Sequence, residues 1–152
     1  MKIELLYATE TGNAEMLCDD FEGELGEGYE CTIQNMGEVD PTSLDRECFY
    51  IFVASSYGSG DLPSTAVSFY DRLVEEKPDL SGVQFAVFGL GDMVFDATFN
   101  QGSERLMTAL LENKASMIGE RGVYDTSTGD LPEDAGLPWL QTIMPQLSAI
   151  AA

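Results

Sequence analysis

Two uninterrupted apolar stretches constrain the fold of this chain most strongly. They are CFYIFVAS, residues 48–55, and VQFAVFG, residues 83–89, and neither alternates regularly between apolar and polar side chains. A strand that is apolar on both faces must be covered on both sides, which is the situation of a buried strand in a parallel sheet. The two stretches therefore predict the centre of a sheet that lies between two layers of helices.

Apolar runs and helical periods alternate along the rest of the chain. Further strands are expected at Ile3 to Tyr7, at Tyr29 to Met36 and at ASMIGERGVY, residues 115–124. Helices are expected where apolar residues recur every three or four positions. The positions that show this spacing are Ala14, Leu17, Cys18, Phe21 and Leu25, then Val67, Tyr70, Leu73 and Val74, then Leu106, Leu110 and Leu111, and finally residues 137–150 with an interruption at Pro145.

This alternation predicts a three-layer α/β sandwich. Right-handed crossovers make the sheet parallel and doubly wound, so we expect five strands in the order 2-1-3-4-5. With 152 residues, 44% of them apolar, the chain is expected to form one domain over residues 1–152. Ligands of such folds bind outside the carboxyl ends of the strands, at the switch point between strands 1 and 3. The loops after strands 1, 3 and 4 are therefore the candidate site.

Charge and the absence of histidine exclude several classes of function. The 7 basic and 27 acidic residues give a net charge of -20, which disfavours nucleic acid and anionic membrane surfaces as partners. A basic protein partner fits this charge, although an acidic surface would also serve solubility alone. Because the chain has no histidine, it cannot form the common hydrolase triad or most transition-metal sites. No catalytic or metal site is predicted.

The cysteines and the N-terminal residues bear on the compartment. Cys18, Cys31 and Cys48 are odd in number and form no Cys-x-x-Cys pair, so we expect reduced and mostly buried thiols. The apolar run after Met1 and Lys2 is too short for a secretory signal, and no stretch approaches the roughly 20 apolar residues of a membrane span. A cytoplasmic protein is expected.

The first candidate loop is TETGNA, Thr9 to Ala14. A tight turn, two hydroxyls and the start of the next helix can hold a phosphate through N–H and O–H groups without a cation. The loop has neither the Walker pattern nor Gly-x-Gly-x-x-Gly, which disfavours a nucleoside triphosphate or NAD. Taken alone, the stretch would also fit an ordinary capped helix start.

The second candidate loop is SSYGSGDLP, residues 55–63. Gly58 and Gly60 permit backbone conformations that other residues avoid, and Tyr57 places one large ring at the end of the strand. A flat ligand could stack on this ring. A glycine-rich turn with one exposed aromatic side chain is the alternative.

The third candidate loop is GLGDMVFDATFNQG, residues 89–102. It combines glycines with the carboxylate of Asp92, the rings of Phe95 and Phe99 and the amide of Asn100; Phe99 would equally serve to cover the core. A phosphate loop beside two aromatic loops favours a planar ring system that carries a single phosphate.

These three loops resemble those of the flavodoxin family, and the resemblance to its short-chain members extends over essentially the whole chain. TETGNA is similar to the FMN phosphate loop, SSYG to the first flavin loop and the third stretch to the second flavin loop. SSYGSGDLP and GDLPEDAGLPWL, residues 129–140, are most similar to the MioC-like group. Ala14 is shared with the FMN domains of cytochrome P450 and sulfite reductases. Phe95 stands where the family usually has Tyr, and one additional residue lies between Phe95 and Asn100.

The resemblance implies an FMN-binding, low-potential electron carrier rather than an enzyme. The phosphate would lie in the first loop, and the flavin ring would lie between Tyr57 and Phe95. The implied cofactor-binding residues are Thr9, Glu10, Thr11, Gly12, Asn13, Ala14, Ser55, Ser56, Tyr57, Gly58, Leu90, Gly91, Asp92, Phe95, Phe99 and Asn100.

The same resemblance indicates the partners. Carboxylates such as Asp61, Asp92 and Asp96 would disfavour the anionic reduced flavin and so lower its potential. The acidic surface would steer the protein to the basic surfaces of a flavodoxin- or ferredoxin-NADP reductase and of an acceptor enzyme. At 152 residues there is no room for an attached NADPH/FAD module, so a separate reductase and a monomeric carrier are expected.

Two other functions remain open at this point. One is an FMN-dependent quinone or nitro reductase on the same fold. The other is a response-regulator-like domain, which would need an acidic pair after strand 1 and a lysine after strand 5. Here residues 9–11 read Thr-Glu-Thr, and no lysine follows Lys114.

Overall fold

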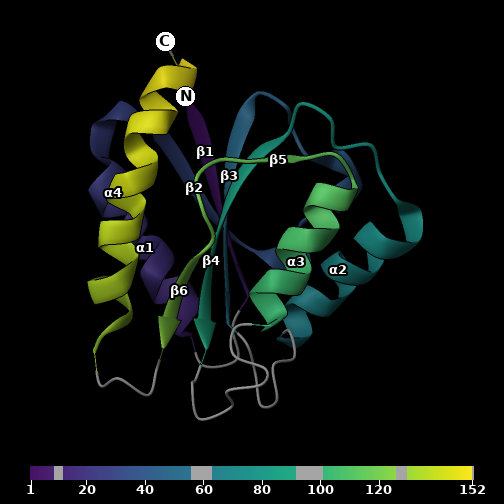
Figure 1. The fold of residues 1–152 in the computed structure, drawn as a ribbon, viewed down its shortest axis with the longest axis horizontal. Helices are drawn as coiled ribbons and strands as arrows, with labels where there is room; N and C mark the ends of the chain where they lie inside the picture. The colour runs from purple at the N-terminus through teal and green to yellow at the C-terminus, as the bar shows by residue number, and fades with distance from the viewer. Residues whose placement is uncertain (9–11, 56–62, 92–100, 126–129, 152) are drawn as a thin grey trace.

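A computed structural model describes residues 1–8, 12–55, 63–91, 101–125 and 130–151 and places a parallel sheet between two pairs of helices (Figure 1). The strands are β1 (Lys2–Ala8), β2 (Glu30–Asn35), β3 (Cys48–Ser55), β4 (Gln84–Gly91), β5 (Ser116–Met117) and β6 (Gly122–Asp125). The helices are α1 (Asn13–Leu25), α2 (Ser64–Glu76), α3 (Gln101–Glu112) and α4 (Pro132–Ala151). Short 3-10 turns occupy Gly26–Gly28, Met36–Glu38 and Pro41–Ser43.

The strand order β2-β1-β3-β4-β5 confirms the predicted topology. β3 and β4 are buried along almost their whole lengths, and β3 has the bounds that its apolar run predicted. β2 alternates between exposed and partly buried residues because it lies at one edge of the sheet. The apolar character of each segment thus matches its position in the sheet.

The predicted fifth strand is divided into two. β5 and β6 both pair in parallel with β4, but the chain between them leaves the sheet after Ile118, whose N–H still donates a 2.8 Å hydrogen bond to the Phe85 carbonyl. Gly119 has φ +71°, which is incompatible with a strand, and a Cβ on it would lie 2.3 Å from Cδ1 of Ile143 on α4. The close approach of α4 therefore fixes the break at a glycine.

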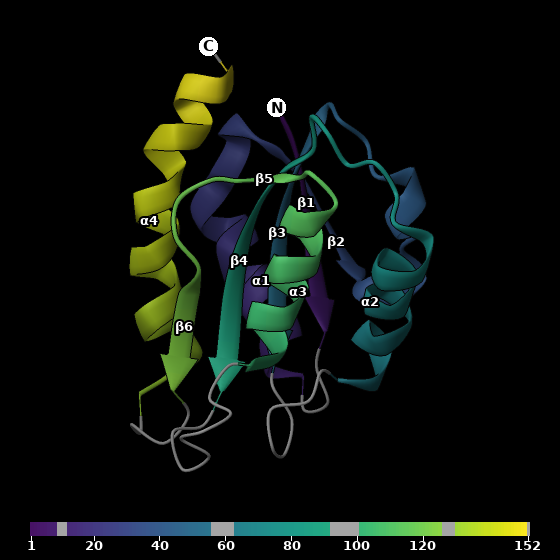
Figure 2. The ribbon, with the colours of Figure 1, turned by 45° about the vertical axis from the view of Figure 1, so that its right-hand side comes forward.

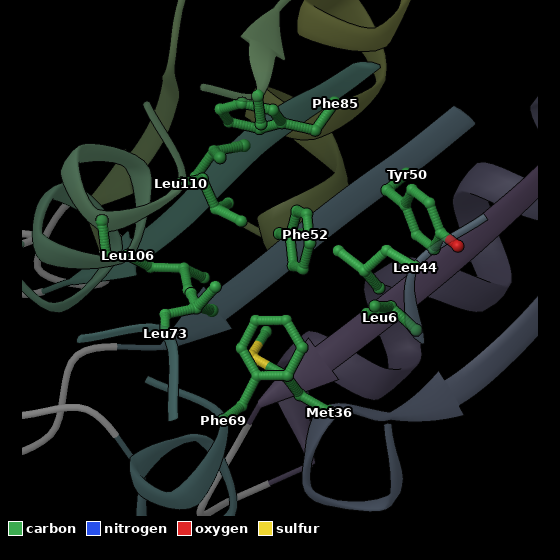
Figure 3. Packing of buried hydrophobic residues seen from close by; sticks show 14 of the residues in the cluster. Leu6, Met36, Leu44, Tyr50, Phe52, Phe69, Leu73, Phe85, Leu106 and Leu110 are labelled. Carbon is green, nitrogen blue, oxygen red and sulfur yellow. The ribbon is translucent and has the colours of Figure 1, made fainter. Parts of the chain in front are cut away.

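Side chains that alternate along the strands build two separate cores. On one face α2 and α3 cover a cluster in which the Phe52 ring lies 5.8 Å from that of Phe69 and 6.1 Å from that of Phe85, measured between centroids (Figure 3). On the other face α1 and α4 cover a second cluster, where Phe88 and Trp139 have centroids 5.2 Å apart. Figure 1 shows the two helix pairs on opposite sides of the sheet.

The last helix differs from the sequence expectation. α4 begins at Pro132 instead of residue 137, and it continues through both Pro138 and Pro145. Proline at the first helical position sacrifices no hydrogen bond, which explains the early start. Burial of the side chains that α4 turns toward the sheet, namely Leu140, Ile143 and Leu147, outweighs the hydrogen bond that Pro145 removes.

The buried stripes of α2 and α3 are also shifted from their predicted positions. Val67 and Val74 on α2 and Leu111 on α3 were assigned to the apolar period, but their side chains are exposed. The α2 residues that meet the sheet are Ala66, Phe69 and Leu73. The predicted thiols agree with the structure, because all three cysteines are free and only Cys31 is partly exposed.

Candidate functional site

Four strands end level with one another at the carboxyl edge of the sheet. Ala8, the last residue of β1, is the register partner of Ala54 on β3, and Ser55 at the end of β3 is the partner of Leu90. Gly91 at the end of β4 is in turn the partner of Asp125 on β6. The strands that precede the three predicted loops therefore end side by side, at the lower edge in Figure 2.

The start of α1 lies at this edge and has a distinctive cap. Gly12 is the N-cap with φ +91°, and its carbonyl accepts a 3.0 Å hydrogen bond from the N–H of Met16. In the described part of the chain no atom lies within 4 Å of where a Cβ on Gly12 would be, so backbone conformation rather than space favours glycine here. Since Gly12 has no side chain, it leaves the first turn of the helix accessible to an external acceptor.

This cap fits a phosphate. The first N–H groups of a helix and the positive end of its dipole together attract an anion. Asn13 is exposed, whereas the side chain of Ala14 is fully buried against the α1–α4 core, so Ala14 can offer only its backbone. α1 contains no Lys or Arg, which means that any anion here is held by dipoles and hydrogen bonds.

The structure places six of the predicted cofactor-binding residues. Gly12, Asn13 and Ala14 lie at the start of α1, while Ser55 and Gly91 end β3 and β4. The side chain of Leu90 is 2% exposed and belongs to the core, so this residue can contact a ligand only through its backbone. The other predicted residues lie outside the described part of the chain: Thr9, Glu10, Thr11, Ser56, Tyr57, Gly58, Asp92, Phe95, Phe99 and Asn100.

A fourth segment at the same edge was missed by the sequence reasoning. β6 carries Asp125 to a position beside Gly91, and the hydroxyl of buried Tyr124 donates a hydrogen bond to the carbonyl of Asp130. The signal was present, because a stretch of Thr, Ser and Gly at 126–129 follows a strand just as similar residues follow β3. Treating residues 115–124 as a single strand hid the point at which β6 leaves the sheet.

Two tyrosines near this edge lie close to carboxylates and have raised pKa values. Burial and the neighbouring Glu15 raise the pKa of Tyr7, which immediately precedes Ala8 at the end of β1. Burial and the carboxylates of Asp130 and Asp125 raise the pKa of Tyr124. A negative local field disfavours any additional negative charge, including an electron added to a ligand at this edge.

One cation supports the start of α3. The guanidinium Nη1 of Arg121 donates a 2.8 Å hydrogen bond to Oγ of Ser103, a residue that is fully buried in the first turn of α3. This bond ties the segment between β5 and β6 to the helix that follows the third predicted loop. It thus fixes the point at which the chain re-enters the layer of helices.

Two further kinds of feature were sought among the described residues, namely metal-binding groups and membrane-spanning helices. Among them, no group of three or more Cys, Asp or Glu side chains is arranged to hold a metal ion. Within the same ranges, no helix combines the length and the apolarity needed to cross a bilayer.

Comparisons with known proteins follow from this geometry. Residues 5–139 match the family model described as flavodoxin. The chain is 30% identical over 138 residues to protein MioC of Escherichia coli strain K12, a match that covers 91% of this chain and 92% of that protein. It is 35% identical over 141 residues to NADPH-dependent diflavin oxidoreductase 1 of Emericella nidulans, covering 90% of this chain but only 21% of that relative.

Solved structures agree with this match. The crystal structure of oxidised flavodoxin 1 from Bacillus cereus superimposes with a TM-score of 0.76 at 25% identity, covering 93% of this chain and 94% of the other. A flavodoxin variant from Pseudomonas aeruginosa gives a TM-score of 0.77 at 26% identity, with 93% and 95% covered. These matches agree with the level strand ends, and they show that the chain belongs to the flavodoxin family, with FMN as its cofactor and electron transfer as its function.

Proposed function

We propose that this chain is a monomeric one-electron carrier, a single domain over residues 1–152 that receives electrons from a separate reductase and delivers them to an acceptor enzyme. The observation that carries the proposal is the carboxyl edge, where β1, β3 and β4 end level and α1 begins at Gly12. FMN supplies the one-electron chemistry when it is bound. The protein would position the cofactor and surround it with the electrostatic field of its acidic residues.

The described residues have distinct parts in this proposal. The backbone N–H groups of Asn13 and Ala14 would bind the phosphate at the start of α1, and Ser55 and Gly91, at the ends of β3 and β4, would lie beside the flavin ring. Asp125 and Asp130 keep the local field negative, which disfavours the reduced, anionic flavin and lowers its potential. The side chains of the two aromatic loops complete the site, in the roles that the resemblance implies for Tyr57 and Phe95.

The net charge of the chain supports basic surfaces on both the electron donor and the electron acceptor. A net charge of -20 accelerates encounters with basic surfaces, and that acceleration falls as salt rises. The free cysteines fit a reducing compartment such as the cytoplasm. The match to this chain covers nearly all of the MioC protein. It covers only 21% of the diflavin oxidoreductase, which is several times longer than this chain.

Cofactor binding provides the first test. Purified protein is titrated with FMN and, in parallel, with riboflavin, which has the same ring but lacks the phosphate. We expect FMN to bind at least about 100-fold more tightly, because about 2.7 kcal/mol is a modest value for a charge-assisted site with several hydrogen bonds. Equal affinity for the two flavins would contradict the phosphate role of the α1 N-terminus.

The second candidate, a quinone or nitro reductase, is tested by turnover. FMN-loaded protein is mixed with NADPH and a quinone, with and without a ferredoxin-NADP reductase. A carrier requires the reductase for NADPH oxidation, whereas a reductase turns over alone. Rapid turnover without the second protein would replace the carrier proposal.

A further inference from the structure

Residues 118–121 between β5 and β6, which we call the β5–β6 loop, are attached to both helix layers. On the α4 side, Nε1 of Trp139 donates a 2.9 Å hydrogen bond to the carbonyl of Glu120. The same ring lies against Gly122, the first residue of β6, so closely that a Cβ there would be 2.5 Å from Cδ1 of Trp139. Figure 2 shows the loop descending between α4 and α3. The backbone of the β5–β6 loop is therefore held from one side by α4.

Arg121 attaches the same loop to the other helix layer. Its Nη1 donates a 2.8 Å hydrogen bond to Oγ of Ser103, in the first turn of α3. The side chain of Ser103 is fully buried, and a buried hydroxyl needs a hydrogen-bond partner within the protein. A bond from a guanidinium is stronger than a bond between two neutral groups. The β5–β6 loop thus joins α4 to the start of α3.

The position of Ser103 connects this hydrogen bond to the candidate cofactor site. The third predicted loop lies between the end of β4 at Gly91 and the start of α3, whose third residue is Ser103. Pairing in the sheet fixes Gly91 at one end of this stretch. At the other end, burial of Leu106 and the bond from Arg121 hold the first turns of α3. Loss of the Arg121 bond would therefore loosen one of these two anchors without touching the start of α1.

We propose that Arg121 is a positioning residue for the flavin ring, because its hydrogen bond to Ser103 fixes the α3 end of the third loop. The inference rests on the proposed function, in which this loop supplies the aromatic side chain of Phe95. Interactions that hold a binding segment in its bound arrangement strengthen binding, since less freedom is lost when the ligand enters. The ring should lose affinity without the bond, whereas phosphate binding at Asn13 and Ala14 should not change.

The charge of Arg121 offers a different route to the flavin. Arg121 is the sole basic residue in the sequence after Lys114, and a cation attracts an anionic ligand whether or not it makes a particular hydrogen bond. A charge effect follows the guanidinium, whereas a positioning effect follows the bond to Ser103. Variants that remove the bond but keep the charge therefore distinguish the two.

The test uses four variants, each loaded with FMN or with riboflavin. Ser103→Ala removes the acceptor and keeps the charge, Arg121→Met removes both, and Arg121→Lys keeps the charge and a donor. Arg105→Met is the matched control, because Arg105 is an exposed cation two residues after Ser103 on α3. The rate of flavin release after dilution is read from the recovery of flavin fluorescence. Visible circular dichroism of the bound flavin reports how the ring is held.

We expect Ser103→Ala and Arg121→Met to speed the release of both flavins by the same factor, about fivefold or more. Arg121→Lys should retain most of the wild-type behaviour, and Arg105→Met should change either rate by less than about twofold. The circular dichroism of the bound flavin should change in the first two variants and stay the same in the control. A bond that only stabilised the fold would lower the free energy of unfolding and leave the release rates and the flavin spectrum unaltered.

Three results would overturn the inference. Faster release from Arg121→Met but not from Ser103→Ala would assign the effect to charge. Unchanged release from both, with a lower free energy of unfolding in urea, would make the bond purely structural. Faster release of FMN but not of riboflavin would place the effect at the phosphate. NADPH oxidation by the wild-type protein alone would contradict the carrier proposal, while the release rates would still decide the role of Arg121.

Discussion

The two helix layers pack alike but present different surfaces. Each covers its side of the sheet with aromatic and aliphatic side chains that are almost completely buried. The charged residues of α1 and α4 are nevertheless all acidic, whereas α2 and α3 also carry Arg72 and Arg105. Arg72 lies 3.1 Å from Asp40 and 2.6 Å from Glu76, so charges on this side are partly paired.

The two layers are therefore alike in the side chains that they bury and differ in the charge of their surfaces. Burial stabilises both layers by the same mechanism, so it does not distinguish the two faces. Unpaired carboxylates contribute little to stability but direct the encounter with a partner. The α1–α4 layer therefore presents the more negative surface of the two, whereas the charges of the α2–α3 layer are partly paired.

The largest expected effects test whether the two cores stabilise the fold equally. Phe21→Ala on α1 and Phe69→Ala on α2 each remove a ring that is almost fully buried, which should cost about 3–5 kcal/mol of unfolding free energy. Urea unfolding is followed by circular dichroism and by fluorescence of Trp139, the single tryptophan, which packs on Phe21. Coincident transitions are expected. Separate transitions, or a cost in one layer only, would break the equivalence of the cores.

The next effect probes how closely α4 approaches the sheet. A Cβ on Gly122 would lie 2.5 Å from ring atoms of both Phe88 and Trp139, so Gly122→Ala should cost about 1–3 kcal/mol by overpacking. Gly23 in α1 is the matched control, because in the described part of the chain no atom lies within 4 Å of its added Cβ. Gly23→Ala should stabilise by about 0.5–1 kcal/mol through helix propensity. Thermal melts measure both, and destabilisation by Gly23→Ala would contradict this packing.

A smaller effect belongs to the α2–α3 layer. Lys114 follows α3 with φ +76°, a left-handed conformation that costs energy for a residue with a side chain. Lys114→Gly should stabilise the fold by about 1 kcal/mol in urea denaturation. Lys114→Gln removes the same charge but keeps the Cβ, so it should bring none of this gain. If both variants behave alike, charge and not backbone conformation controls this position.

The smallest expected effect is on the pH dependence of stability, compared for one carboxylate from each layer. Asp20 on the α1 side is mostly exposed, but slight burial, together with Glu133 and Asp19, raises its pKa above the ordinary value of 3.8. Between these values the folded chain binds more protons than the unfolded chain, so stability falls as pH rises through this window. Asp20→Asn should therefore stabilise at pH 7, by less than about 1 kcal/mol because the group is exposed, with no gain below about pH 4.

Asp40 on the α2 side should behave in the opposite way. Hydrogen bonds from the Thr42 hydroxyl and N–H, at 2.6 Å and 2.8 Å, lower its pKa, and Arg72 adds to this effect. The stability that it contributes is present above its ordinary pKa and is lost as pH falls through the lowered one. Asp40→Asn should destabilise at pH 7, as measured by thermal melts across the pH range. Gains of the same sign in both variants would remove the distinction between the layers.

Sequence alone predicted the centre of this fold well and its periphery less well. The bounds of β3 follow from its apolar run, because a strand covered on both faces leaves a continuous signal. The break at Gly119 and the course of α4 through Pro145 depend on contacts between distant segments, which local pattern does not contain. Helix stripes failed at Val67 and Val74 for the same reason: apolar side chains at helical spacing do not reveal which face the sheet will bury.

The candidate site was predicted to a similar extent. Strand order was sufficient to bring Gly12, Ser55 and Gly91 to one edge, because parallel strands all end on the same side. Asp125 was missed, since its position depends on where β6 leaves the sheet. The roles of Tyr57 and Phe95 remain predictions that rest on the resemblance.

The divided outer strand has a consequence for how copies of this chain behave at high concentration. β5 has two residues and β6 has four, and the loop at Gly119 separates them, so neither presents a long row of backbone donors and acceptors. Long regular edges invite intermolecular strand addition, which is a route to aggregates and fibrils. Val123 on β6 is 41% exposed, and on a continuous edge strand this apolar side chain would favour association with another molecule. The interruption limits this edge as a template for sheets between molecules.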